Sequence, residues 1–521
     1  MTRTGRTRGA SCRHAHTSAS TRRRSRPRWP SSRPCRAFAP ADDRVALADV
    51  DDPPTPVYPP LADRDALLTE LDRLISAAWE SFDRPRAEEP GLDEDLRVRL
   101  EEPLPELPSD PRDALADAAR LLDESNSPAR PLYLAYVGST GLEVGVLGAA
   151  LAATYDVNLA ATAGAADLVE AQALEWVAEL IGFPHSEGAF TSGGMTSNLT
   201  ALLVARERAL PGSRVNGFDG GRCAVYCSEE AHHSVVRAAE AAGVGSKQVR
   251  QVPIDGRRKV RADALEEAIT ADRERGVTPI SVVANGGTTL TGTVDPLDDL
   301  ADVCARHGVW LHVDGAYGLP AAATPRARHL FGGLDRADSV TLDAHKWLGI
   351  QKSCSVILVR EHGALERSFG HEETYMRRTA AVNLVERTLE YSRPLNSLKL
   401  WLALRTHGAA ELRRWIEHTL ALAGMLADAI RRDHDFELLH EPELSTVCFR
   451  HLPAGVEDLD AHNEALAAAA QADGRIYLAD ALLDDRRCLR VCFVNFRTRS
   501  EDVPFVLDTL RELGDALSSD G

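Results

Sequence analysis

The sequence predicts an α/β protein with a mostly parallel sheet that is covered by helices. Between about residues 130 and 360, short apolar runs alternate with helical patterns, and such alternation builds parallel sheets with helices on both faces. Several chemically useful side chains directly follow these runs, at the edge where open α/β sheets bind their ligands. With 44% hydrophobic and 26% charged residues, the composition suits an ordinary globular protein.

The first 60 residues differ from the rest of the 521-residue chain. Residues 1–40 contain eleven Arg and neither Asp nor Glu, and Ser and Pro are frequent up to residue 60. Such a segment buries too little apolar area to fold by itself, so we predict a disordered Arg/Ser/Pro-rich extension. An organelle-targeting segment and a nucleic-acid contact are the alternatives.

Residues 61–130 are predicted to form an N-terminal helical segment. Apolar residues recur at three- and four-residue spacing from Leu61 to Trp79, and a second helix is expected near 111–122 with Pro111 at its start. Two helices without a sheet make only a small core. We therefore expect them to pack on the main domain or on a partner subunit.

Residues 131–395 are predicted to form a large domain and residues 396–521 a small α+β domain. Strands of the large domain are expected at 223–227, 248–252, 280–284, 309–313, 339–342 and 353–359, and helices at 167–181, 233–242, 262–275 and 297–307. In the small domain, a long helix is expected at 397–431 and alternating strands at 437–450 and 488–496.

Charge and cysteine content argue against several classes of protein. The net charge of −18 includes the eleven arginines of residues 1–40, so the remaining chain carries −18 − 11 = −29, which disfavours a nucleic-acid-binding surface. The nine cysteines form neither a CxxC pair nor a disulfide framework, and no apolar run is long enough to span a bilayer. We therefore expect a cytoplasmic protein without nucleic-acid, membrane or metal partners.

Lys346 is the first candidate for catalysis. It is one of five lysines among 60 Lys and Arg residues, and it stands between two apolar runs where a predicted strand ends. An amine can lose its proton and become a nucleophile, which guanidinium in practice cannot. A surface lysine beside Trp347 is the alternative.

Three further features follow predicted strands or begin a helix. Gly193 and Gly194 directly precede a helical pattern, whose free N–H groups suit a phosphate. Asp314 ends one apolar run and His232 follows another. Taken separately, a helix cap, a structural aspartate and a loop histidine are the alternatives. Together with Lys346, these groups suit a cofactor that has a phosphate, a pyridine nitrogen and an aldehyde.

Five motifs give the chain a resemblance to a known family. They are Thr191-Ser192-Gly193-Gly194, Ala231-His232, Gly287-Thr288-Thr289, His312-Val313-Asp314-Gly315-Ala316-Tyr317 and Asp343-Ala344-His345-Lys346-Trp347. In this order they resemble the group II pyridoxal-phosphate-dependent amino acid decarboxylases, which include the aromatic-L-amino-acid, histidine and glutamate decarboxylases. The resemblance covers about residues 61–513. It implies fold type I of the pyridoxal-phosphate enzymes, with pyridoxal 5'-phosphate as cofactor.

The resemblance also implies a role for each motif. Lys346 would link covalently to the cofactor aldehyde, and Asp314 would pair with the pyridine nitrogen. His232 would stack on one face of the ring, with the Ala316 methyl on the other. Asp343 and Trp347 are expected to be structural. The residues expected to hold the phosphate or line the cofactor are Gly193, Gly194, Met195, His345 and Thr289.

Tyr375 bears on the type of reaction. It lies about thirty residues beyond Lys346, in a polar segment. In the aromatic decarboxylases, a loop tyrosine at this position is thought to reprotonate the α-carbon after CO2 has left, whereas phenylalanine is associated with oxygen-dependent aldehyde formation. The resemblance therefore implies simple decarboxylation, and an exposed loop tyrosine is the alternative.

Tyr133 and Tyr136 provide the one substrate signal. They lie in a segment, 131–136, that resembles the pocket-lining stretch of the family, and they favour an aromatic L-amino acid. A decarboxylase of glutamate, aspartate or diaminobutyrate, a transaminase or carbon-carbon lyase of the same fold, and a non-catalytic binding protein are the alternatives. Because family members generally dimerise, we expect a homodimer in which the 61–122 helices cross over.

Overall fold

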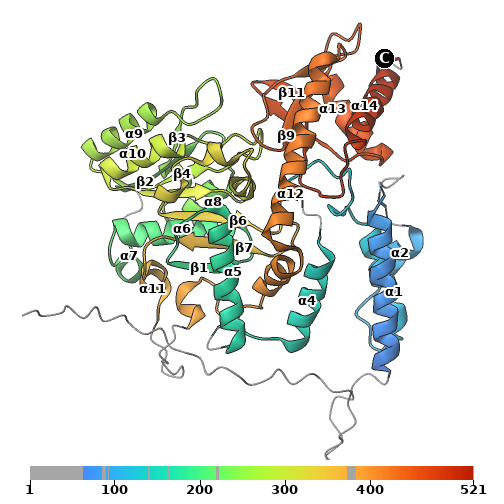
Figure 1. Cartoon of the computed structure of the whole chain (residues 1–521), viewed down its shortest axis with the longest axis horizontal. Helices are drawn as coiled ribbons and strands as arrows, with labels where there is room; N and C mark the ends of the chain where they lie inside the picture. Colours follow the sequence, from blue (N-terminus) through green and yellow to red (C-terminus); the bar gives the residue numbers. More distant parts are fainter. Residues whose placement is uncertain are drawn as a thin grey trace, which may run out of the picture. The chain divides into compact units, whose positions relative to one another are not determined.

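A computed structural model gives the fold (Figure 1). It describes residues 63–84, 90–91, 93–138, 141–160, 163–218, 222–371 and 383–519. Asp65–Gly521 form one compact unit, separate from Met1–Arg64, and the following description concerns that larger unit. The predicted extension of residues 1–60 and the predicted role of Tyr375 lie outside the described residues.

A seven-stranded sheet, with the strand order β1-β7-β6-β5-β4-β2-β3, lies at the centre of this unit. Its parallel strands are β2 (Cys223–Ser228), β3 (Val249–Val252), β4 (Thr278–Asn285), β5 (Trp310–Asp314) and β6 (Ser339–Asp343). β7 (Ser355–Val359) is antiparallel to its neighbours β6 and β1 (Glu187–Thr191). The predicted mostly parallel sheet is confirmed. The sequence does not predict β1, a short run whose conformation is set by pairing with β7.

Helices cover both faces of the sheet. Neighbouring residues of each central strand point to opposite faces, and the apolar side chains on each face pack against helices. In β2, the side chains of Cys223, Val225 and Cys227 pack with α6 (Gly194–Ala209) and α8 (Ser234–Ala241). Ala224 and Tyr226 point to the other face and share a core with α5 (Ala165–Ile181), α9 (Ala262–Glu274) and α10 (Leu297–His307). Burial on both faces explains why these strands read as continuous apolar runs.

A second sheet of four antiparallel strands has the order β10-β11-β9-β8. Its strands are β8 (Phe436–Leu438), β9 (Thr446–His451), β10 (Ala479–Leu483) and β11 (Arg486–Cys492), and α13 (Leu459–Asp473) and α14 (Asp502–Ser519) pack beside it. The prediction of a single strand at 437–450 is wrong. The chain reverses between β8 and β9, near Pro442, which has no N–H for a ladder.

The long helix α12 (Ser397–Arg432) contributes to the cores of both sheets. It is kinked at Gly408, whose φ of 76° is open to glycine but strained for other residues. The remaining helices are α1 (Arg64–Phe82), α2 (Glu94–Leu100), α3 (Pro111–Asp123), α4 (Glu143–Tyr155), α7 (Ser213–Asn216) and α11 (Ala364–Phe369). None of the helices within the described ranges has the length and apolar character of a membrane span.

Candidate active site

The motifs named above follow strands that end at the same edge of the large sheet. Asp314 is the last residue of β5 and Asp343 the last residue of β6, while His232 comes shortly after β2. β1 runs in the same direction as β6, because each is antiparallel to β7, so Gly193 and the start of α6 also lie at this edge. Parallel strands thus bring together residues that are up to 150 positions apart.

Lys346 lies in the turn that follows β6. Its Nζ is 3.1 Å from Oδ2 of Asp343, and a quarter of its side chain is exposed. Asp343 itself is 2% exposed, and its Oδ2 also lies 3.6 Å from Nε2 of His345. The amine is therefore held at the strand end while it remains accessible from the site. Asp343, for which the sequence suggests only a structural part, contacts this amine directly.

Asp314 receives hydrogen bonds on both carboxylate oxygens. The Asn198 side-chain amide donates to Oδ2 at 2.7 Å, and the backbone N–H of Ala316 donates to Oδ1 at 3.2 Å. Both donors are neutral and the carboxylate is 9% exposed. Each carboxylate oxygen thus has a neutral donor, and the side chain can still pair with a cationic ligand.

Asn198 is oriented by a chain of hydrogen bonds that reaches across the sheet. Nε1–H of Trp310 donates to Oγ of Ser339 at 2.8 Å, and Ser339 lies 2.9 Å from Nδ1 of His312. Nε2 of His312 lies 3.0 Å from Oδ1 of Asn198. Oδ1 of Asn198 can only accept, so Nε2–H of His312 donates to it, and Nδ1 of the neutral ring accepts from the Ser339 hydroxyl. Burial lowers the pKa of His312 to about 4, so the ring is neutral in this chain.

The same amide also orients His232. Nδ2 of Asn198 donates to Oγ of Ser234 at 2.9 Å, and Ser234 contacts Nδ1 of His232 through its hydroxyl at 2.8 Å and its N–H at 3.2 Å. Nδ1 is therefore an acceptor and Nε2 carries the proton. Partial burial lowers the pKa of His232, and the negative charge of Asp314 opposes that change. One asparagine thus connects the two residues expected to meet the cofactor ring.

The start of α6 forms the side of the site that suits a phosphate. Gly194 and Met195 are the first residues of this 16-residue helix, and their N–H groups have no intrahelical acceptor. A Cβ atom at Gly194 would lie 3.1 Å from the Ala316 methyl and 3.0 Å from Oδ2 of Asp343. The absence of a side chain therefore keeps this corner open, as a cradle for an anion requires.

His345 and Asp343 border the same corner. A Cβ at Gly193 would lie 3.9 Å from Cε1 of His345. Burial lowers the pKa of His345, which makes its ring a neutral hydrogen-bond donor or acceptor. Oδ1 of Asp343 is a buried oxygen for which the described residues provide no hydrogen-bond partner. A carboxylate oxygen only accepts hydrogen bonds, so a ligand that meets this atom has to present a donor to it and not an anionic oxygen.

Thr289 is exposed on the loop after β4, and Arg490 holds its backbone. Nε of Arg490, in β11, donates to the Thr289 carbonyl at 2.9 Å, and Nη1 donates to the Ala135 carbonyl at 2.6 Å. Arg490 is 5% exposed. This arginine from the second sheet thus joins the Thr289 loop to the 131–136 segment.

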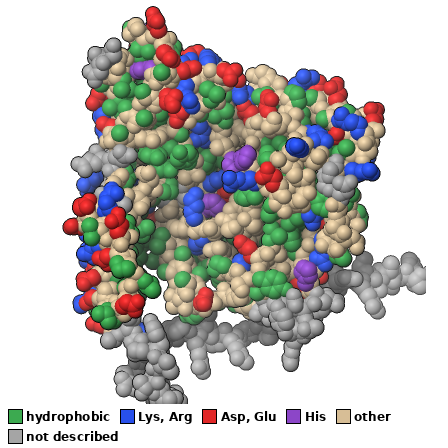
Figure 2. Space-filling view, turned by 180° about the vertical axis from the view of Figure 1, so that it is seen from behind, with side chains coloured by type: hydrophobic (Ala, Val, Ile, Leu, Met, Phe, Trp, Pro, Cys, Tyr) green, Lys and Arg blue, Asp and Glu red, His purple; other side chains and the backbone are tan. Residues whose placement is uncertain are grey.

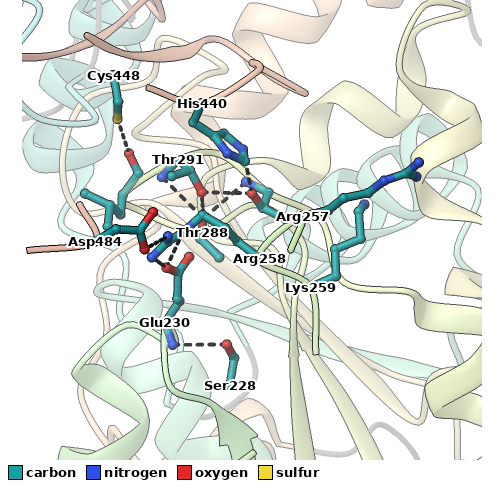
Figure 3. A network of polar contacts seen from close by, with 12 residues as sticks. Ser228, Glu230, Arg257, Arg258, Lys259, Thr288, Thr291, His440, Cys448 and Asp484 are labelled. Atoms are coloured by element: carbon teal, nitrogen blue, oxygen red, sulfur yellow. Dashed lines mark hydrogen bonds and ion pairs between the residues drawn. The ribbon is translucent and has the colours of Figure 1, made fainter. Parts of the chain in front are cut away.

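A polar network next to this loop also spans the two sheets (Figure 3). Nε of Arg258 donates to Oε1 of Glu230 at 2.6 Å, and Nη1 of Arg258 donates to Oδ1 of Asp484 at 2.5 Å. Thr288 and Thr291 share a hydrogen bond of 2.9 Å. Glu230 is two residues from His232, and Thr288 precedes Thr289. These contacts therefore fix the backbone next to both site residues.

Sequence reasoning assigns no role to Asn198, Ser234 and Arg490, and it names His312 only as part of a motif. His312 and Asp314 are alternate residues of an otherwise apolar strand, so they share one face. Asn198 lies one helical turn beyond Gly194, on the buried side of α6. These spacings are a usable signal for polar residues that point into a site. Arg490 has no such signal in the sequence, because its partners are backbone carbonyls at least 200 residues away.

Comparison with known proteins assigns the chain to a class of cofactor enzymes. Residues 94–452 match the family model described as pyridoxal-dependent decarboxylase conserved domain. The chain is 33% identical over 435 residues to an aromatic-L-amino-acid decarboxylase of Bacillus atrophaeus, which covers 81% of this chain and 89% of the relative. It is 32% identical over 365 residues to the acidic amino acid decarboxylase GADL1 of Mus musculus, which covers 67% of this chain and 66% of that relative.

A solved structure shares the fold over nearly its whole length. The structure of Oryza sativa TDC with PLP and tryptamine has a TM-score of 0.83 at 26% identity, and the match covers 88% of this chain and 99% of that one. The chain belongs to the pyridoxal-dependent decarboxylase family. It is a pyridoxal-phosphate-dependent amino acid decarboxylase, a carboxy-lyase of fold type I.

The site fits pyridoxal phosphate. It offers an accessible amine on Lys346, a carboxylate held by neutral donors at Asp314, and open N–H groups at the start of α6. When bound, the cofactor supplies an aldehyde that takes up amines and a ring that withdraws electrons from the amino acid α-carbon. The residues described above would orient these groups of the cofactor.

Proposed function

We propose that the chain decarboxylates an aromatic L-amino acid to the corresponding amine and CO2. In this proposal Lys346 carries the cofactor, and Asp314 keeps the ring nitrogen protonated. His232 and Ala316 contact the two faces of the ring. The remaining cofactor contacts come from Gly193, Gly194, Met195, His345 and Thr289.

The hydrogen-bond network around Asn198 is the observation that supports these roles best. It holds Asp314 and His232 by neutral donors whose positions do not depend on a ligand. A carboxylate fixed in this way can stabilise positive charge on a partner without reorganisation, which is the main electrostatic contribution that an enzyme makes.

The Lys346→Ala variant tests the role of the amine. It should lose both the visible absorption band of the bound cofactor and the release of CO2, because Lys346 is the residue proposed to carry the cofactor. Lys247→Ala, a substitution at a distant lysine, is the matched control and should keep both. CO2 release by Lys346→Ala at the wild-type rate would overturn the assignment.

The proton that replaces CO2 on the α-carbon is assigned to Tyr375 or to Lys346. In the Tyr375→Phe variant we expect aldehyde and peroxide in place of part of the amine, as the family resemblance implies. Product analysis of amine and aldehyde, with peroxide measured in parallel, checks this. If the variant forms only amine at the normal rate, Tyr375 has no part in the step.

The position of the 131–136 segment supports an aromatic substrate. Tyr133 stacks on Tyr477 with ring centroids 5.0 Å apart, which fixes the segment to the chain just before β10. Arg490 binds the carbonyl of Ala135 and that of Thr289. Tyr136, the next residue, is 59% exposed, and its ring is therefore free to contact a substrate side chain near the Thr289 loop.

An acidic substrate is the second candidate, and Lys352 is the observation that favours it. Lys352 is exposed, and its partial desolvation and the charge of Lys346 lower its pKa. Its own charge lowers the pKa of His345. An exposed lysine six residues after Lys346 is a candidate to pair with a second carboxylate of the substrate.

A substrate panel with two variants separates the candidates. The panel contains tyrosine, tryptophan, dopa, histidine, glutamate, aspartate and diaminobutyrate. If the substrate is aromatic, Tyr136→Ala should lower kcat/KM about tenfold for it, as loss of one aromatic contact does, and Lys352→Ala should change it little. If the substrate is acidic, only Lys352→Ala should have this effect.

We also propose a homodimer that uses the N-terminal helices. α1 and α3 contain no buried residue, and they border an apolar groove of about 500 Å³ that is lined by Leu74, Phe82 and Leu115, among others. Figure 2 shows apolar side chains among the charged ones on this face of the molecule. Light scattering should give twice the chain mass, and replacing the exposed Leu68 and Leu122 by Glu should lower it.

A cytoplasmic location completes the proposal. Seven cysteines within the described residues are buried free thiols, as is usual in a reducing compartment. Fractionation of cells that produce the chain checks this location.

A further inference from the structure

We propose that Lys399 is a positioning residue that prepares His345 to donate a hydrogen bond to the cofactor phosphate, acting through the Ser353–Cys354 peptide. The inference concerns how the cofactor is held. It does not depend on which amino acid is decarboxylated.

Lys399 is a buried cation with an unusual set of partners. It is 3% exposed, and its Nζ lies 3.3 Å from the carbonyl oxygen of Gln351 and 3.2 Å from those of Lys352 and Ser353. An ammonium group has three N–H donors, and three carbonyls accept them here. Lys399 is also the third residue of α12, where the helix dipole disfavours a cation. The three carbonyls offset this cost and the cost of burial.

One of these carbonyls belongs to a peptide that contacts His345 on its other side. The Ser353 carbonyl accepts from Lys399, and the Cys354 N–H of the same peptide lies 3.1 Å from Nδ1 of His345. Hydrogen bonds in such a chain polarise each other, so a cation on the carbonyl strengthens the N–H as a donor. Lys399 and His345 are thus coupled through one peptide unit.

This peptide decides which nitrogen of His345 carries the proton. Nδ1 lies 3.1 Å from the Cys354 nitrogen and 3.0 Å from the Cys354 oxygen, so either tautomer has a partner. The Cys354 oxygen already accepts from the His345 backbone N–H at 3.1 Å. The Cys354 N–H is buried and needs an acceptor. Donation from Cys354 to Nδ1 satisfies both groups, and it leaves the proton on Nε2.

The Nε2–H tautomer suits the phosphate corner. His345 borders Gly193 at the start of α6, where the open N–H groups suit an anion. A neutral ring with a proton on Nε2 can donate to a phosphate oxygen there, whereas a ring with a bare Nε2 would repel it. Lys399 therefore favours phosphate binding without touching the phosphate.

The test compares two ligands that differ only in the phosphate. The full-length chain is dialysed against a series of pyridoxal 5'-phosphate or pyridoxal concentrations, and bound ligand is measured. In Lys399→Met we expect affinity for the phosphate ester to fall about tenfold while affinity for pyridoxal falls less than twofold, as loss of one charge-assisted hydrogen bond predicts. Equal losses for both ligands would overturn the proposal.

Two controls separate positioning from general loosening. Lys259→Met removes another partly buried lysine, which binds the Val294 carbonyl and Glu443, and should leave the ratio of the two affinities unchanged. In a His345→Phe background, Lys399→Met should cause less than a twofold further loss of this ratio, because Lys399 acts through the imidazole. A full tenfold further loss would show that Lys399 acts on the phosphate by another route.

A spectroscopic measurement can overturn the proposal even where Lys399→Met does not fold. The ¹⁵N chemical shifts of His345 in the wild-type chain should show the proton on Nε2, with the signal assigned from its loss in His345→Phe. A proton on Nδ1 in the wild-type chain contradicts the proposal.

Discussion

Asp314 and Asp343 end the neighbouring strands β5 and β6, and both are largely buried, yet the protein satisfies them in different ways. Asp314 accepts from two neutral donors, the Asn198 amide and the Ala316 N–H. Asp343 has Lys346 as its nearest cation, and its Oδ1 lacks a partner among the described residues. Two similar carboxylates at one sheet edge thus have different kinds of partner: neutral hydrogen-bond donors for Asp314 and a lysine for Asp343.

The difference shows how charge is controlled at this edge. The donors of Asp314 are set by the fold and do not rely on a ligand, and one of them, the Asn198 amide, is oriented by the ring of His312. The partner of Asp343 is the amine of Lys346, the group expected to link to the cofactor. The carboxylate at position 314 is therefore held in place by the fold, whereas we expect the surroundings of Asp343 to change if Lys346 links to the cofactor.

Removing the charge of Asp314 should have the largest effect. Asp314→Asn keeps the shape of the side chain but removes the negative charge, and we expect kcat to fall about 10³-fold. CO2 release under saturating substrate measures this. Asp343→Asn is the matched control, and a loss of similar size in that variant would remove the contrast between the two aspartates.

Breaking the network that holds Asp314 should have the next largest effect. Asn198→Ala leaves His312, Ser234 and Asp314 without their common partner. We expect kcat to fall about 10- to 100-fold and stability to fall by about 2 kcal/mol, as for a buried donor or acceptor left unpaired. Turnover and denaturant unfolding are measured on the same samples. Lower stability with wild-type kcat would mean that the network serves the fold alone.

Neutralising Asp343 should strengthen cofactor binding, whereas loss of a favourable contact would weaken it. Its carboxylate lies beside Gly194, on the side of the site expected to hold the phosphate, where like charges repel each other. In Asp343→Asn we therefore expect cofactor affinity to rise up to about tenfold, with kcat within about tenfold of wild type. A cofactor titration checks this, and weaker binding in the variant contradicts it.

Lowering the pH should reduce folding stability through His312, a residue of the Asp314 network. Near neutral pH this is the smallest of the expected effects. Burial lowers the pKa of this ring from 6.5 to about 4. As the pH falls from 6.5 to 4, His312 becomes protonated in the unfolded chain but stays neutral in the folded one. Folding stability therefore falls by up to about 3 kcal/mol. Above pH 6.5 this contribution is constant. Unfolding in denaturant at pH 7, 6 and 5 measures the slope.

His451 provides the matched control for this pH dependence. Burial also lowers its pKa to about 4, but its partner is His462 beside the second sheet. Both His312→Asn and His451→Asn should flatten the dependence of stability on pH, while only His312→Asn should also lower kcat. A parallel loss of stability with falling pH in wild type and His312→Asn would contradict the assigned pKa.

Much of this molecule follows from sequence because burial imposes patterns that can be read directly. Strands buried on both faces are continuous apolar runs, so the strands of the large sheet are predicted to within a few residues, and residues at their ends are recognised as site candidates. β1 and the reversal between β8 and β9 are not predicted, because their conformations depend on partners far away in the chain.

The sequence by itself determined the α/β class, the order of the five motifs, and the groups that a phosphate, a pyridine nitrogen and an aldehyde require. Only the tertiary structure showed that Asn198 joins Asp314 to His232, that Asp343 meets Lys346, and that Lys399 reaches His345 through a backbone peptide. The physical reason is that a hydrogen bond depends on atoms a few ångströms apart, and backbone carbonyls carry no mark of their partners in the sequence.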